Sequence, residues 1–138
     1  GIAGARRAAQ LAPASVVIGS ESRYCDLEVP AAWASSMVVP SIVLLSAATR
    51  VLPSAPQLPI GTSARVGGTM DCAVEAMEGF GVLRSAQLAG VPALEVRAIA
   101  NEIEESDRAR WHFDAAFAAI TAMTPLLVAE LRRTLARA

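Results

Sequence analysis

The sequence contains no lysine, and all 12 of its basic residues are arginine. This absence excludes a catalytic Schiff base, the lysine of a phosphate-binding loop and the lysine of a protein kinase. The arginines are balanced by 13 acidic residues, so the formal net charge is -1. A chain without a basic surface has little to hold a phosphate backbone, and we expect no nucleic-acid partner.

Residues that bind metals are nearly as scarce, since the chain has one histidine, His112, and two cysteines, Cys25 and Cys72. This set cannot build a zinc site of the common Cys/His type, and the acidic segment 102–105 has no further ligand spaced to complete a site. We therefore expect neither a metal nor a cofactor. Two cysteines do not form a disulfide scaffold either, which favours small apolar fillers in a reducing, cytoplasmic setting.

Long hydrophobic runs are also missing. The longest apolar run, 37–48, is shorter than the roughly 20 residues that cross a membrane, and the first residues do not read as a secretory signal. We therefore expect no membrane partner. What the chain does have is an apolar share of 54% with only 18% charged residues, which excludes a disordered tail. Its 138 residues predict one domain over 1–138.

Local patterns predict a mixture of strands and helices. Apolar and β-branched runs predict strands over 15–20 (with 22–27 as a continuation), 58–66 (ending in a loop) and 92–100, and a short strand or extended entry over 73–75. Apolar residues spaced three and four apart predict helices over 76–89 and from 107 or 114 to the end, with Pro125 expected to kink or split the last one. The segment 41–52 fits a helix or a buried strand, and its length favours the helix. Loops are expected over 1–4 and 27–40.

The order of these elements indicates the fold class. Strand, helix, strand and helix follow one another in the second half, which predicts an α/β unit with a right-handed crossover. Apolar residues on both faces of 92–100 are typical of an interior strand in a sheet that is covered on both sides.

Two polar residues stand where α/β proteins bind ligands. Glu78 lies at the start of the predicted helix 76–89, where the helix dipole favours a carboxylate that accepts hydrogen bonds from a pair of hydroxyls. Asn101 is the only asparagine and follows the predicted strand 92–100, and an amide at a strand end donates and accepts at once. Position alone still favours an ordinary first-turn glutamate and a turn asparagine.

Other polar residues have structural interpretations. Glu95 and Arg97 lie two apart on one predicted strand, hence on one face, and we expect them to be structural charges that pair with each other or with neighbouring charges. His112 stands between Trp111 and Phe113 at a predicted helix start, which favours a packed or capping histidine over a ligand.

The segments 74–81 (VEAMEGFG) and 90–101 (GVPALEVRAIAN) resemble the nucleoside phosphorylase and nucleosidase superfamily, and their wording is closest to its futalosine hydrolase branch. The opening GIAGA with 16–24 (VVIGSESRY) is similar to that family's Gly-rich loop and following strand, and the last stretch to its terminal helix. The resemblance implies a three-layer α/β/α fold with a mixed central sheet.

The resemblance also implies a purine nucleoside site. Glu78 would take the sugar hydroxyls beside Met77 under the ribose, and Asn101 would face the purine N7. As further substrate-binding residues the resemblance implies Ala3 and Gly4 of the Gly-rich loop, and Arg65 and Val66 of the loop against the base.

The implied reaction is hydrolysis of an N-glycosidic bond. Adenosine-type nucleosidases are expected to carry aspartate where this chain has Asn101. An amide there accepts from N7–H and donates to O6, which suits hypoxanthine and hence futalosine in menaquinone biosynthesis. A purine nucleoside phosphorylase, using phosphate in place of water, and a truncated, non-catalytic nucleoside-binding subunit stay open as alternatives.

One departure from the family is expected to matter. Its members begin with a further α/β segment that carries the first strands and a carboxylate that orients the water, and this chain starts at the Gly-rich segment. Glu21 is too remote a substitute for that carboxylate. A sheet without its leading strands would expose an edge that invites pairing, so we expect association, as a homodimer or through that edge.

Overall fold

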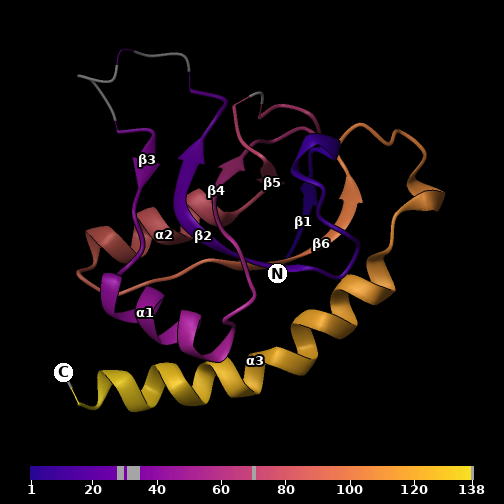
Figure 1. Cartoon of the computed structure of the whole chain (residues 1–138). Coiled ribbons are helices and arrows are strands. Elements are labelled where there is room, and N and C mark those ends of the chain that lie inside the picture. Colours follow the sequence, from indigo (N-terminus) through magenta and orange to yellow (C-terminus); the bar gives the residue numbers. More distant parts are fainter. Residues whose placement is uncertain (28–29, 31–34, 70, 138) are drawn as a thin grey trace.

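Strands and helices are interspersed along the computed structural model, which describes residues 1–27, 30, 35–69 and 71–137 (Figure 1). The strands are β1 (Ile2–Ala5), β2 (Val16–Tyr24), β3 (Met37–Val38), β4 (Gln57–Thr62), β5 (Val74–Ala76) and β6 (Val96–Glu102). The α-helices are α1 (Ile42–Val51), α2 (Gly79–Leu88) and α3 (Phe113–Leu135), with 3-10 turns at Arg7–Ala9 and Arg108–Arg110.

The strands form one mixed sheet in the order β3-β2-β4-β5-β1-β6. β2, β4 and β5 run parallel to one another, while β1 and β6 run parallel to each other and antiparallel to those three. β2 also pairs with β6, so five of the strands close on themselves. The mixed sheet flanked by helices that the resemblance implied is confirmed.

The inside of the closed sheet is filled by one cluster of mostly small side chains. It takes residues from all five closing strands: Ala3, Ala5, Val17, Ile60, Val74, Ala76 and Ile99. A ring of few strands has a narrow interior, because the diameter grows with the number of strands, so alanine and valine fit where larger side chains would not.

The helices cover the outside of the sheet. α1 and α3 pack on the outer face of β2 through Ile18, Ala48 and Met123, and they run below the strands in Figure 1. Ala98 and Ala116 belong to a second cluster in which small side chains let α3 approach β6 closely. α2 packs against β2, β3 and β4.

α3 runs through Pro125 without ending. Proline removes one hydrogen bond to the carbonyl of the residue four positions earlier, Thr121. Both residues are exposed, so water can take that bond. By length and composition α3 could also cross a membrane, a test that the core helix of a soluble protein passes as well.

Three boundaries differ from the prediction. The segment expected as the loop 1–4 is strand β1, because its backbone pairs with β5 on one side and β6 on the other. The helix expected from residue 76 begins at Gly79, because Ala76 still pairs with Thr62 of β4. The strand expected over 92–100 begins at Val96 and runs to Glu102, so Asn101 lies inside it.

The predicted right-handed crossover is wrong as well. β5 and β6 are not neighbours, since β1 lies between them, and they run antiparallel. In the expected loop 27–40, residues 37–38 form β3 against β2, while 28–29 and 31–34 lie outside the described residues.

The expected open edge is largely absent from the part of the chain that the structure describes. β1 and β6 are paired on both sides, and the strand at the free end of the order is β3, which has two residues. Association through an edge left by missing strands therefore loses its physical basis, while association itself stays a prediction.

The two cysteines lie among packed side chains, Cys72 with 2% of its surface exposed. Burial raises the pKa of the Cys25 thiol to about 11, and the nearby Cys72 adds to the effect. Because a thiolate is the reactive form, we expect Cys25 in the folded chain to resist iodoacetamide at pH 7.5 and to react faster as the pH approaches 11. Mass spectrometry of the alkylated peptide checks this, with urea-unfolded chain as the fast control. Rapid alkylation of the folded chain at pH 7.5 would contradict it.

Candidate active site

A cavity of about 370 Å³ opens where β1, the junction between β5 and α2, and the end of β6 come together. Its lining comes from five separate stretches of the chain: Gly1 to Gly4, Val66, Glu75 to Glu78, Arg97 with Ala100 and Asn101, and Trp111 with Phe113. Segments far apart in sequence therefore share one wall, because the closed sheet brings β5, β1 and β6 side by side.

Glu78 reaches this cavity from the start of α2. The helix start is held by the Phe80 backbone amide, which donates to the Thr62 hydroxyl at 2.9 Å. Glu78 itself occupies the N-cap position but makes no side-chain capping bond, and 67% of its side chain is exposed. Its carboxylate therefore does not cap the helix and is available to a ligand.

Asn101 faces β1 across the sheet, paired with Gly4. Its Nδ2 donates to the Glu102 carbonyl at 2.9 Å, and since a carbonyl only accepts, this bond fixes which end of the amide is nitrogen. Oδ1 then remains as an acceptor. A side chain at position 4 would lie 3.1 Å from Nδ2, so glycine at this point leaves room for the amide.

Arg97 stands beside Glu78 at the cavity. Its Nη1 donates to the Glu78 carboxylate at 3.2 Å and to the Ile2 carbonyl at 3.3 Å, while its Nε donates to Glu95 at 2.8 Å. The predicted pair of Glu95 and Arg97 is confirmed. The sequence also allowed a neighbouring charge as partner but did not name Glu78, because Arg97 and Glu78 are 19 positions apart and meet only in the fold.

The loop that carries Val66 is held by hydrogen bonds on both sides. Buried Glu75 accepts from the Gly67 amide at 2.7 Å and from the Thr69 amide at 3.0 Å. Asp26 accepts from the Ala64 amide at 2.6 Å and from a serine hydroxyl, and these bonds lower the pKa of the Asp26 carboxyl. Val66 is therefore presented to the cavity from an anchored loop.

Two aromatic rings close another side of the cavity. The rings of Trp111 and Phe113 lie with their centroids 5.5 Å apart, and the Trp111 indole donates to the Glu105 carbonyl at 2.9 Å. The His112 amide donates to the Ala100 carbonyl at 2.7 Å, which docks this segment on β6. His112 is the N-cap of α3 without a side-chain cap bond.

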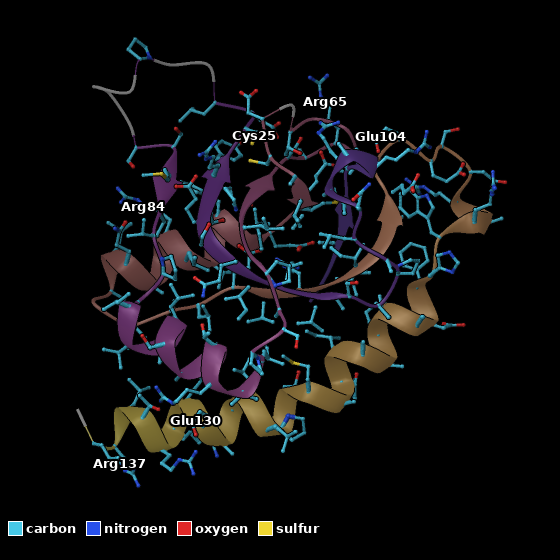
Figure 2. All side chains as sticks on the ribbon, viewed as in Figure 1. Cys25, Arg65, Arg84, Glu104, Glu130 and Arg137 are labelled. Carbon is cyan, nitrogen blue, oxygen red and sulfur yellow. The ribbon has the colours of Figure 1, made fainter. Side chains whose placement is uncertain are left out.

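Most of the residues singled out in the sequence line this cavity, namely Ala3, Gly4, Val66, Met77, Glu78 and Asn101. Arg65 is not part of the lining among the described residues, and Figure 2 shows it at the outer rim, pointing away from the strands. Its contact with a base stays a prediction. The charged and aromatic lining residues that sequence reasoning missed are Glu75, Arg97, Trp111 and Phe113.

A second cavity, of about 400 Å³, lies on the other side of Asn101. Its rim carries the ion pairs of Arg7 with Glu102 and of Arg110 with Glu105, which neutralise most of its charge. Within residues 1–27, 30, 35–69 and 71–137, no group of three His, Cys, Asp or Glu side chains lies close enough to hold a metal ion.

Comparison with solved structures identifies the architecture. The chain superposes with a TM-score of 0.78 on a 5'-methylthioadenosine/S-adenosylhomocysteine nucleosidase from Colwellia psychrerythraea in complex with adenine, at 18% identity over 98% of this chain and 65% of that one. It superposes with a TM-score of 0.76 on futalosine hydrolase of Helicobacter pylori, at 17% identity over 96% of this chain and 65% of that one. The chain has the nucleoside phosphorylase/nucleosidase fold.

Sequence comparison adds a partial match. No family model matches the sequence. A stretch of 47 residues, 34% of this chain, is 53% identical to futalosine hydrolase of Streptomyces coelicolor and covers 20% of that protein. The chain thus spans just under two thirds of the solved structures named above, and its sequence match extends over a fifth of the curated relative.

Proposed function

We propose that this chain forms the purine nucleoside site of an N-glycosidic hydrolase. The observation that carries the proposal is the shared cavity, in which Glu78 and Asn101 come from different elements yet line one space together with Met77. An exposed carboxylate and a buried amide in one pocket match the two ends of a nucleoside, the sugar hydroxyls and the polar edge of the base.

Glu78 acts on the ribose. As the bond between sugar and base stretches, positive charge develops on the ribose ring, and a carboxylate that holds the hydroxyls lies close enough to stabilise that charge. A preorganised group of this kind is worth about 3–4 kcal/mol in the transition state. The contact with Arg97 orients the carboxylate without enclosing it, since most of the Glu78 side chain is exposed.

Asn101 acts on the leaving base. Because its Nδ2 is bound to the Glu102 carbonyl, Oδ1 is left to accept a hydrogen bond from N7–H once the departing base has taken a proton from water at N7, and the second N–H of the amide remains for O6. That arrangement fits a 6-oxopurine. The rings of Trp111 and Phe113 supply an apolar wall against which a flat base packs.

The water nucleophile needs a base that the described lining does not supply. Glu75 is held by its loop bonds and Glu78 by Arg97 and the sugar, and no third carboxylate lines the cavity among the described residues. Glu21 lies outside this lining and is paired with Arg23. The water-orienting carboxylate is therefore expected from outside this set of residues.

The finer proposal is futalosine as the substrate, cleaved to hypoxanthine and dehypoxanthine futalosine in menaquinone biosynthesis by a cytoplasmic homodimer. Support comes from the 47 residues shared with futalosine hydrolase of Streptomyces coelicolor and from the amide at position 101. The match to a nucleosidase in complex with adenine supports a purine ligand more broadly.

The test is release of hypoxanthine from futalosine, followed by chromatography, with and without phosphate. We expect release that does not depend on phosphate. Strict dependence on phosphate would select the phosphorylase alternative, and nucleoside binding without release would select the non-catalytic subunit. A chain that binds neither futalosine nor inosine in calorimetry would overturn the proposal.

A further inference from the structure

We propose that Glu95 is a positioning residue for the ribose site: it balances the charge of Arg97 and thereby leaves the Glu78 carboxylate free for sugar hydroxyls. The inference rests on the proposed function and concerns a residue that does not itself line the cavity. Three charged side chains, from the start of α2 and from β6 with the residue just ahead of it, lead from the interior to the ligand space.

The exposed fraction of the side chain rises along this series, from Glu95 through Arg97 to Glu78. The Glu95 side chain is 4% exposed, Arg97 is 11% exposed and Glu78 is 67% exposed. Arg97 lies closer to Glu95, at 2.8 Å from its Nε, than to Glu78, at 3.2 Å from its Nη1. The buried carboxylate is therefore the stronger partner of the guanidinium, and the exposed carboxylate is the looser one.

Burying the Glu95 carboxylate costs free energy, and packing alone does not explain why the fold keeps it. Its second oxygen, Oε2, is buried and has no hydrogen-bond partner among the described residues. A side chain at Gly79 would overlap the Glu95 carboxylate, so the first turn of α2 lies directly against it. A helix N-terminus favours a nearby negative charge, which offsets part of the cost of burying this group.

The consequence concerns Glu78. An arginine this buried needs a carboxylate, because an unpaired buried charge costs several kcal/mol. With Glu95 present, that need is met on the protein side of Arg97. Without the negative charge at 95, Glu78 would be the remaining carboxylate partner of Arg97, and it would be drawn onto the guanidinium and away from the ribose.

Glu95→Gln tests this, since glutamine keeps the shape and removes the charge. Calorimetry on the full chain compares three probes: inosine, 2′,3′-dideoxyinosine and hypoxanthine. We expect inosine affinity to fall about tenfold, while the affinities for dideoxyinosine and hypoxanthine stay within about twofold of wild type. Gly79→Ala, which displaces the same carboxylate from the helix side, should produce the same selective loss.

The matched control is Glu130→Gln. Glu130 is also buried and also pairs with an arginine, Arg50 at 2.8 Å, but it lies between α3 and α1, away from the cavity (Figure 2). The Glu130→Gln variant should have a lower melting temperature but an unchanged ratio of inosine to dideoxyinosine affinity. A Glu95→Gln chain that keeps the wild-type ratio would overturn the positioning role alone. A wild-type chain that binds no inosine would overturn the proposed function, and this role with it.

Discussion

Glu78→Gln is expected to lower the rate of hypoxanthine release at least about a hundredfold, because the variant keeps the hydrogen-bonding shape but removes the charge that faces the developing cation on the ribose. Glutamine also leaves Arg97 with Glu95 as its carboxylate partner, so the fold around the site should persist. The measurement is base release from futalosine at saturating substrate, together with the melting temperature to show that the variant is folded.

Glu21→Gln is the control for that experiment. Glu21 is a carboxylate on β2 that pairs with Arg23 and is not part of the cavity lining. The Glu21→Gln variant should release hypoxanthine at close to the wild-type rate. If Glu78→Gln were to turn over futalosine as fast as the wild type, Glu78 would have no role in the reaction and the assignment of the ribose end would be wrong.

Asn101→Asp is expected to change which base the site accepts. The ionised carboxylate cannot donate to the O6 of hypoxanthine, and it would face the Glu102 carbonyl, which now accepts from Nδ2. A site that loses a matched hydrogen bond to its ligand discriminates by about a hundredfold or more. When protonated, the same group can give a proton to N7 of adenine. We therefore expect kcat/KM to fall about a hundredfold for inosine and to rise for adenosine.

The Asn101→Ala variant distinguishes a change of base preference from simple loss of the side chain. Alanine removes both the donor and the acceptor, so it should lower kcat/KM for both nucleosides and give a ratio between those of the wild type and Asn101→Asp. The measurement is the ratio of kcat/KM values for inosine and adenosine in the three proteins. If the Asn101→Asp variant still prefers inosine, this position does not read the 6-substituent.

Local sequence patterns located most elements but not their partners. The strands over 15–20 and 73–75 and the helix over 41–52 are confirmed, because proline, glycine and apolar spacing act within a few residues. The segment 1–4 was expected to be a loop, since small residues without alternation carry no strand signal. It is a strand because β5 and β6 offer hydrogen bonds on both sides, which no local pattern can show.

The candidate site likewise has residues that the sequence could mark and a contact that only the fold creates. The residue types and the resemblance marked Glu78 and Asn101, and the structure places both in one cavity. The local pattern predicts Arg97 as a structural charge that pairs with Glu95 or with a neighbouring charge. Its second contact, with Glu78, depends on how β5 and β6 are arranged around β1, and nothing in the spacing of the residues encodes that arrangement.

By itself, the sequence determined what chemistry this protein can offer: no lysine, one histidine, a carboxylate ahead of a helix and a single asparagine near a strand end. Those facts follow from composition and from short-range geometry. Only the tertiary structure decided that the sheet closes through the pairing of β2 with β6, and that Trp111 and Phe113 join a pocket begun at Gly1 to Gly4. Long-range strand pairing is selected by the burial of the whole core, so it becomes visible when the chain is folded and not before.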